Sequence, residues 1–177
     1  MKVYETTSEK LGKVMDLLVK QIKHEFTNER LYRYFSDFFK NEGLLHLSKY
    51  YNERACEEKK HAQWIINYLH DLDIIEDYSL VSEKLDPIKN YIDTFTATID
   101  REVLTTNMIK NIIKVAREDN DEMTLSFIFG CHGDRLGKLL PEQLEEEKLS
   151  RTVYNIAKQD SDWIAKEEAI LHYYENR

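Results

Sequence analysis

The chain between Leu44 and Leu72 reads LLHLSKYYNERACEEKKHAQWIINYLHDL. Apolar and aromatic residues recur along it every three or four positions, as on one face of an α-helix. They are Leu47, Tyr50, Tyr51, Ala55, Ala62, Ile65, Ile66 and Leu69. Two polar residues, Glu58 and His61, lie within this face, three positions apart and so on the same side of the helix. The stretch predicts a long helix that packs one face against a core. That face holds a carboxylate and an imidazole, both of which can bind a metal ion.

A first helix is predicted over about residues 7–40. Apolar residues recur along it at the helical period, and Thr6 with Glu9 has the spacing of a capping box at its start. Nothing ends the pattern before Asn41-Glu42-Gly43. The first two predicted helices are therefore separated only by a short turn.

A long connection and a third helix follow. Residues 73–86 lack a clear period, and the next helix is expected to start at Pro87, with Asp86 as its cap, and to run to about Arg117. A connection of this length allows the second and third helices to run parallel, as in a bundle with one long crossover.

The last third of the chain is less regular. Three of the five glycines lie between Met123 and Pro141, where we expect a short apolar helix over about residues 123–130 and then a loop. Proline disfavours helical geometry at the preceding Leu140, so the next helix is expected to begin at Pro141 and to end near Lys158. A short final helix is expected after a cap at Asp160 or Ser161.

Composition narrows the functional classes. The net charge of −8 disfavours nucleic acid as a partner, because phosphate binding needs clustered Lys and Arg. No apolar run is long enough to span a membrane, and the N-terminus lacks the pattern of a signal peptide. Cys56 and Cys131 form no disulfide framework. We expect a soluble, cytoplasmic, all-α protein with a single domain over residues 1–177.

Carboxylates lie within the apolar faces of the other helices as well. Glu25 does so in the first helix and Glu102 in the third, and the fourth opens with Glu142, Glu145, Glu146 and Glu147. Buried carboxylates without a cation are strongly unfavourable. Several carboxylates with one imidazole suit iron or manganese better than copper or structural zinc. The pattern predicts a di-metal centre inside the bundle.

Each of these sequence features has a simpler explanation when taken alone. A Glu-x-x-His spacing on a helix occurs by chance, and a single glutamate can reach solvent at the edge of a bundle. A run of acids at the start of a helix is usually a solvated face that the helix dipole favours. The combination across four helices is what indicates metal binding.

Together these motifs resemble those of the non-haem bacterial ferritins. The likeness rests on Gln21-Ile-Lys-His-Glu25-Phe with Tyr32, Ala55-Cys-Glu57-Glu58-Lys-Lys-His61-Ala62, Arg101-Glu102-Val-Leu-Thr, and Glu142-Gln143-Leu-Glu145-Glu146-Glu147. It covers nearly the whole chain except residues 123–141. The resemblance implies a ferritin-like four-helix bundle with one long crossover and a short C-terminal fifth helix.

The resemblance also implies roles for single residues. Glu25 and His61 would hold a first iron, Glu58 would bridge to a second, and Glu102 and Glu146 would hold that second iron. Gln143 would hydrogen-bond close by, and Tyr32 would orient a ligand or supply an electron. A third, inner iron site would use Glu57, Glu142, Glu145 and Glu146.

The activity implied is that of a ferroxidase, which oxidises Fe²⁺ with O₂ or H₂O₂ at a di-iron centre and stores the ferric product. The partners implied are copies of the same chain in a cage of 24 subunits. No haem is predicted, because Lys59 and Lys60 stand beside His61 in place of a haem-ligand Met.

Several alternatives stay open at this stage. Cys131, His132 and Asp134 in the glycine-rich stretch form either a modified iron-entry site or a surface insertion without a role, and a dimer, a twelve-mer or an altered cage remains an alternative assembly. The same ligands would also serve a di-iron oxidase or peroxide-scavenging protein without a mineral core. A helical scaffold that has lost its metal ranks last, because every expected ligand is present.

Overall fold

The computed structural model describes residues 8–75, 85–131 and 136–176, and the side chains from residue 12 onward. The described part of the chain contains six α-helices: α1 (Ser8–Asn41), α2 (Leu45–Asp71), α3 (Tyr91–Glu118), α4 (Glu122–Phe129), α5 (Leu139–Ala157) and α6 (Trp163–Glu175). The described part contains no strand. A search of these helices finds none with the length and apolarity needed to cross a membrane.

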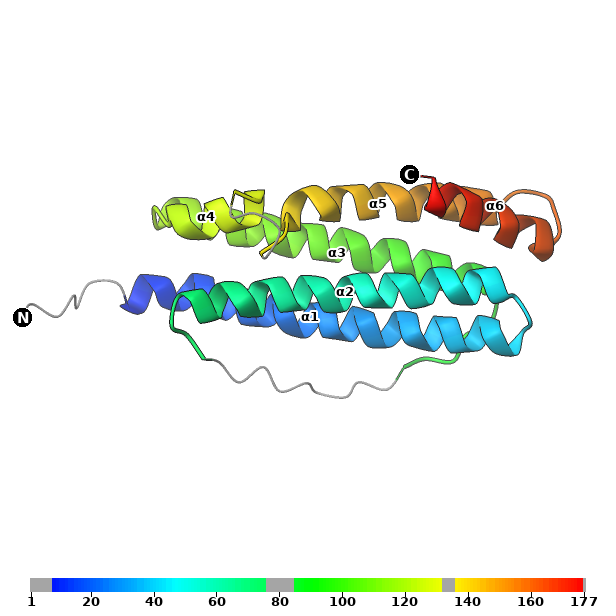
Figure 1. Ribbon diagram of the computed structural model, residues 1–177, viewed down its shortest axis with the longest axis horizontal. Helices are drawn as coiled ribbons and strands as arrows, with labels where there is room; N and C mark the ends of the chain where they lie inside the picture. The colour runs from blue at the N-terminus through cyan, green and yellow to red at the C-terminus, as the bar shows by residue number, and fades with distance from the viewer. Residues whose placement is uncertain (1–7, 76–84, 132–135, 177) are drawn as a thin grey trace, which may run out of the picture.

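The long helices form two antiparallel pairs. α1 packs along α2, and α3 packs along α5, while α1 also contacts α3 (Figure 1). α2 and α3 run in the same direction, so the end of α2 at Asp71 and the start of α3 at Tyr91 lie at opposite ends of the bundle. The prediction of an all-α bundle with one long crossover is confirmed.

The first two helices agree closely with the expected ranges. α1 ends near Gly43, whose φ of 78° lies in the left-handed region that glycine adopts without strain. The backbone N–H of Leu44 then donates to the carbonyl of Phe39 at 2.9 Å and closes the turn. The capping box expected at Thr6 and Glu9 lies outside the described side chains.

The start expected for the third helix was wrong. α3 begins at Tyr91, and the side chain of Asn90 caps it by accepting from the backbone N–H of Asp93 at 3.0 Å. Asp86 and Pro87 precede the helix in irregular chain. The Asn90 side chain satisfies an N–H that the first turn leaves unpaired, which gives the helix a later start than proline alone indicated.

The fourth bundle helix is split into α4 and α5. Asp121 caps α4 by accepting from the N–H of Thr124, and Gly130 ends it with a φ of 81°. α5 begins at Leu139, so the expectations that it would start at Pro141 and that Leu140 would not be helical were wrong. A proline in the first turn costs no hydrogen bond, because those N–H groups have no partner within the helix.

Gly137, just before α5, lies against α2. Gly137 has a φ of 66° and lies directly on the indole ring of Trp64, which leaves no room for a Cβ atom. Cys131 is exposed, whereas His132 and Asp134 lie outside the described residues.

α6 folds back against α2 and α5 (Figure 1). Its cap is Asp162, which accepts from the N–H of Ala165 at 2.9 Å, so the expectation of Asp160 or Ser161 was wrong. The buried carboxylate of Glu167 accepts from the backbone N–H groups of His46 and Leu47, at 2.8 and 3.3 Å. A residue of α6 therefore caps the N-terminus of α2, where Leu44 offers no side-chain acceptor.

The core has two apolar clusters. One joins α1, α2, α3 and α4 around residues such as Leu18, Ile65 and Ile112. The other is rich in aromatic rings and includes Tyr51 and Phe39, which stack with their centroids 5.6 Å apart. Buried polar residues fill the middle of the bundle between the clusters: Gln21, His24, Glu25, Asn28, Arg54, Glu58, His61, Thr98, Glu102, Thr105, Thr106, Gln143, Glu146 and Ser150. We call this set the polar belt.

Candidate metal centre

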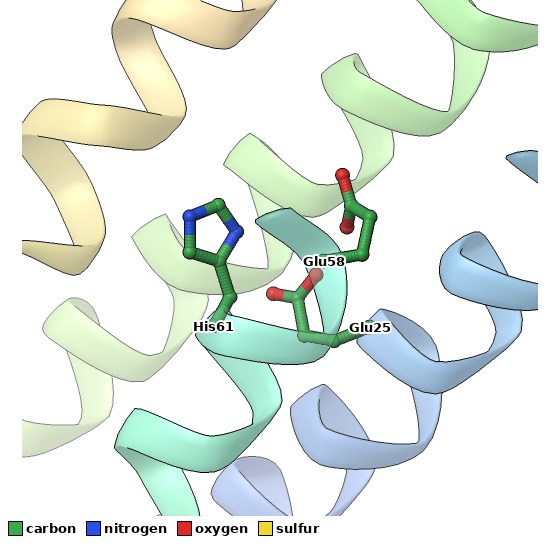
Figure 2. Close-up of side chains that lie close together, drawn as sticks. All are labelled: Glu25, Glu58 and His61. Atoms are coloured by element: carbon green, nitrogen blue, oxygen red, sulfur yellow. The ribbon is translucent and has the colours of Figure 1, made fainter. Parts of the chain in front are cut away.

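The first possible metal site in the polar belt joins Glu25 of α1 with Glu58 and His61 of α2. Their ligand atoms all lie within 4.8 Å of one another, and all three residues are buried. Figure 2 shows the two carboxylates and the imidazole converging from neighbouring helices. Regular helical spacing explains this, since residues three apart on α2 share the side that packs on α1.

Several atoms of this first group lack hydrogen bonds. Glu25 Oε2, Glu58 Oε1 and both ring nitrogens of His61 have no hydrogen-bond partner among the described residues. The other oxygens are held, because Gln21 Nε2 donates to Glu25 Oε1 at 2.6 Å and Asn28 Nδ2 donates to Glu58 Oε2 at 3.1 Å. Buried polar atoms usually have hydrogen-bond partners, so a convergence of buried oxygen and nitrogen atoms without them fits a cation site.

The second possible metal site joins Glu58 with Glu102 of α3 and Glu146 of α5. These ligand atoms also lie within 4.8 Å of one another and are buried. Glu58 belongs to both groups, which is the arrangement of two metal positions with one bridging carboxylate. Residues from four helices therefore meet here, as the sequence predicted.

Tyr32 and Gln143 hold the Glu102 carboxylate. The Tyr32 hydroxyl donates to Glu102 Oε1 at 2.6 Å, and Gln143 Nε2 donates to Glu102 Oε2 at 2.7 Å. Both residues are fully buried and point at a candidate ligand. The structure thus brings Tyr32 and Gln143 next to the acids with which the sequence associated them.

Sequence reasoning missed Arg54. This residue lies one turn before Glu58 on α2, and its side chain is completely buried. Its guanidinium contacts Glu102 Oε1 at 2.6 Å, Glu57 Oε2 at 2.9 Å and Glu146 Oε1 at 3.0 Å. The available signal was its position next to Ala55 in the apolar face, four residues before Glu58, where a charged side chain needs a partner.

Crowding and burial change the pKa values of the acids. Burial raises the pKa of Glu58 well above its usual value, and the nearby carboxylates of Glu102 and Glu25 raise it further. Burial likewise raises the pKa of Glu146 to about 7, although Arg54 opposes the shift. These groups are costly to ionise without a cation, so a divalent metal ion would favour their charged forms.

The pKa of His61 shifts through the same crowding. Burial lowers it, but the carboxylates of Glu146, Glu142 and Glu25 outweigh burial and raise the pKa of His61 to about 9. A metal ion at this imidazole would take the place of the bound proton.

Three of the four acids expected at an inner iron site lie toward the surface. Glu57 and Glu142 are half-buried and Glu145 is exposed, and all three line a pocket of about 620 Å³ together with Glu146. Glu57 accepts from the Tyr174 hydroxyl of α6 at 3.1 Å in addition to pairing with Arg54. Neither buried ligand group includes these three residues. Only Glu146 belongs to both the pocket and the buried centre.

The sequence of this chain matches a known protein family and several of its members. A profile described as the ferritin-like domain matches residues 15–153. The bacterial non-heme ferritin of Staphylococcus aureus (strain USA300) is 27% identical over 142 residues, which cover 80% of this chain and 81% of that protein. Ferritin BfrB of Mycolicibacterium smegmatis is 29% identical over 145 residues, which cover 80% of this chain and 74% of that protein.

Solved structures give the same fold. An open pore ferritin from the hyperthermophilic archaeon Archaeoglobus fulgidus superposes with a TM-score of 0.78 at 20% identity, covering 90% of this chain and 96% of that chain. The predicted ferritin-like four-helix bundle is therefore confirmed. Since the profile match spans most of the chain and agrees with the motifs, this protein belongs to the ferritin-like family and resembles its non-haem bacterial members.

Proposed function

We propose that this protein is an iron-storage ferritin with ferroxidase activity, which oxidises Fe²⁺ with O₂ or H₂O₂ and stores the ferric mineral. The observation that carries the proposal is the pair of buried ligand groups that share Glu58. Fe²⁺ is the substrate, and two ions together give two electrons, which reduce O₂ to H₂O₂ or H₂O₂ to water.

In this proposal the protein positions two ions and balances their charge. Glu25 and His61 hold the first ion, Glu58 bridges, and Glu102 and Glu146 hold the second. Tyr32 and Gln143 orient Glu102 through their hydrogen bonds. Four acids that line the adjacent pocket, Glu57, Glu142, Glu145 and Glu146, receive the product on its way out of the bundle, as a third iron site.

We also propose a homo-oligomeric cage, with 24 copies of a single domain spanning residues 1–177. Large apolar side chains on five helices support this proposal, because they are exposed in the single chain: Leu45, Leu104, Met123, Phe129, Leu144 and Ile164. The cytoplasm is the proposed compartment, since Cys56 and Cys131 are both free and exposed.

A second candidate is a di-iron oxidase or peroxide scavenger without a mineral core. The observation that favours it is the engagement of Glu57 by Arg54 and Tyr174, which occupies one acid of the proposed third site. Both candidates use the same buried ligands.

Oxygen uptake and iron loading test the proposal. The wild type is expected to consume O₂ on addition of Fe²⁺, and Glu58→Gln is expected to lose at least about a hundredfold in initial rate, since both sites lose a ligand. The matched control is Glu29→Gln on α1, which loses an acid paired with Arg33 at the surface and is expected to oxidise iron normally.

Particle size separates the two candidates. A hollow particle of high mass that holds many irons per chain after aeration supports storage. A dimer that takes up only two irons per chain supports the oxidase, and wild-type activity in Glu58→Gln contradicts both.

A further inference from the structure

Arg54 brings a fixed positive charge into the candidate metal centre. Its side chain is completely buried, and its guanidinium carbon lies 5.7 Å from the centroid of the Tyr32 ring. One nitrogen, Nη2, contacts Glu102 at 2.6 Å, and the other, Nη1, contacts Glu146 at 3.0 Å and Glu57 at 2.9 Å. Arginine keeps its proton throughout the physiological range, so this charge does not disappear by titration.

The contacts of Arg54 fall mainly on one of the two ligand groups. Glu102 and Glu146 belong to the second group, and Nη2 also lies 3.6 Å from the shared Glu58. In the first group Glu25 and His61 have other neighbours, because Gln21 bonds Glu25 and the imidazole faces Glu142 and Glu146. The guanidinium therefore pairs with all three ligands of the second group, but with only the shared member of the first.

The charges of the buried side chains also distinguish the second metal position from the first. Four carboxylates, those of Glu25, Glu58, Glu102 and Glu146, lie buried in the centre and together match the four positive charges of two divalent ions. Arg54 adds a fifth positive charge within hydrogen-bond distance of two of these acids. At such short range, in a buried site, the repulsion of a second divalent ion is substantial.

We propose that Arg54 is a positioning residue that competes for the second metal position, so that the centre binds its two divalent ions in sequence. The first ion binds at Glu25, Glu58 and His61. The second binds only as the guanidinium gives up Glu102 and Glu146. This inference rests on the proposed function, because it assigns an order of binding to the same site.

Glu57 provides the guanidinium with a remaining partner. It is three residues from Arg54 on α2, already accepts from Nη1, and lies at the lining of the pocket outside the buried ligands. An arginine that loses Glu102 and Glu146 to a metal ion thus keeps one ion pair. Without such a partner, a buried guanidinium would be strongly unfavourable.

Titration with Co²⁺ under anaerobic conditions tests the proposal, because Co²⁺ reports its ligands by absorbance and needs no oxidation step. Calorimetry and absorbance together give the two stepwise dissociation constants. The wild type is expected to show a second constant at least about a hundredfold weaker than the first. Arg54→Gln is expected to tighten the second step at least about tenfold and to change the first less than about threefold. The control Arg33→Gln removes a surface guanidinium bonded to Glu29 and is expected to keep the wild-type ratio.

A second variant covers the case in which Arg54→Gln does not fold. Arg54→Lys keeps the charge, but an ammonium cannot span three carboxylates in the way a guanidinium does. Its ratio of constants is expected to lie between those of the wild type and Arg54→Gln. An unchanged ratio in both variants, or a weakening of both steps, overturns the role of Arg54.

The same titration separates the inference from the proposed function. Two ions bound by the wild type with equal constants, unchanged by either substitution, remove the inference but leave the di-metal centre. A wild type that binds no Co²⁺ in the bundle overturns the proposed function and the inference with it.

Discussion

Glu102 is the most firmly held of the candidate ligands. Tyr32 and Arg54 both contact its Oε1 atom at 2.6 Å, while Gln143 donates to Oε2 at 2.7 Å. These three partners come from three helices, so the position of a single carboxylate on α3 depends on how α1, α2 and α5 are placed in the bundle. Preorganisation of this kind lowers the cost of orienting a ligand when a metal ion arrives.

Tyr32→Phe tests that preorganisation. The substitution keeps the ring but removes a hydrogen bond to a charged group, a contribution of about 1.5–3 kcal/mol. Iron oxidation, followed by stopped-flow absorbance, is expected to slow about tenfold, and the first step of Co²⁺ binding is expected to stay unchanged. Tyr34→Phe, a half-buried neighbour on the same helix, serves as the control. Equal rates in the wild type and Tyr32→Phe would show that Arg54 and Gln143 suffice.

Tyr68, which lies outside the polar belt, makes the stability of the fold depend on pH in the alkaline range. Its hydroxyl lies 2.9 Å from Thr124 Oγ1, and burial raises the pKa of Tyr68 to about 12 even though that hydrogen bond opposes the shift. In the unfolded chain a tyrosine has a pKa of about 10. The stabilising contribution is therefore complete below pH 10 and is lost as the pH rises toward 12, because only the unfolded chain releases the proton.

Tyr68→Phe is expected to weaken this pH dependence. Between pH 10 and 12 the free energy of unfolding of the wild type should fall more steeply, by up to about 1.4 kcal/mol per pH unit, the effect of one proton. Urea denaturation at pH 8, 10 and 11 measures the slopes. A pH-independent loss from the missing hydrogen bond leaves the slope unaffected, so equal slopes in the two proteins would contradict the assignment.

At the scale of elements, the four long helices follow the hydrophobic period of the sequence, whereas their ends follow local hydrogen bonds. The ranges of α1 and α2 agree with prediction because one period runs unbroken through each. The start of α3 and that of α6 were misplaced because Asn90 and Asp162 act as caps and nearby polar residues do not. Several candidate caps in a row cannot be ranked from sequence, since each needs only one suitable backbone angle.

The described residues just before α5 contact α2 through Gly137 and Trp64. Gly137→Ala would place a Cβ atom within the Trp64 ring and force a left-handed φ on a residue that disfavours it. We expect a loss of about 1–3 kcal/mol in the free energy of unfolding, measured by urea denaturation. Gly12→Ala is the matched control, because that helical glycine has open space around its Cβ position, and a gain of about 0.5–1 kcal/mol is expected there. Equal stability of Gly137→Ala and the wild type would mean that this segment moves freely off Trp64.

At the scale of the whole molecule, the polar belt divides the core. Apolar clusters lie on both sides of it, and four buried carboxylates stand between them with one arginine and one histidine as the cationic partners in the described contacts. Polar residues thus replace apolar packing at the centre of this bundle, where they form the candidate metal centre. Metal ions should therefore stabilise the folded chain.

Thermal unfolding with and without metal tests this coupling. At a Co²⁺ concentration about a hundred times the dissociation constant, binding adds about 2.7 kcal/mol, which for a chain of this size raises Tm by about 5–10 °C. Scanning calorimetry in Co²⁺ and in chelator measures the shift. Glu58→Gln is expected to lose most of it and Glu29→Gln to keep it. A shift of the same size in Glu58→Gln would locate the bound metal elsewhere.

The long helices and most of the ligands that face inward could be predicted from the amino-acid sequence, because helical period assigns every side chain of a regular helix to a face. Helical period indicated Glu25, Glu58, His61 and Glu102, the resemblance to ferritins added Glu146, and all five residues are found together. Which charges neutralise one another depends instead on the packing of distant helices. Arg54 and Glu102 are 48 residues apart in the chain, and the pairing of Glu167 with His46 and Leu47 also joins distant segments. Such contacts depend on how helices pack and on where α6 returns, which no local pattern encodes. The ligands of the candidate metal centre could therefore be predicted from the sequence, whereas the guanidinium of Arg54, which we propose competes for them, could not.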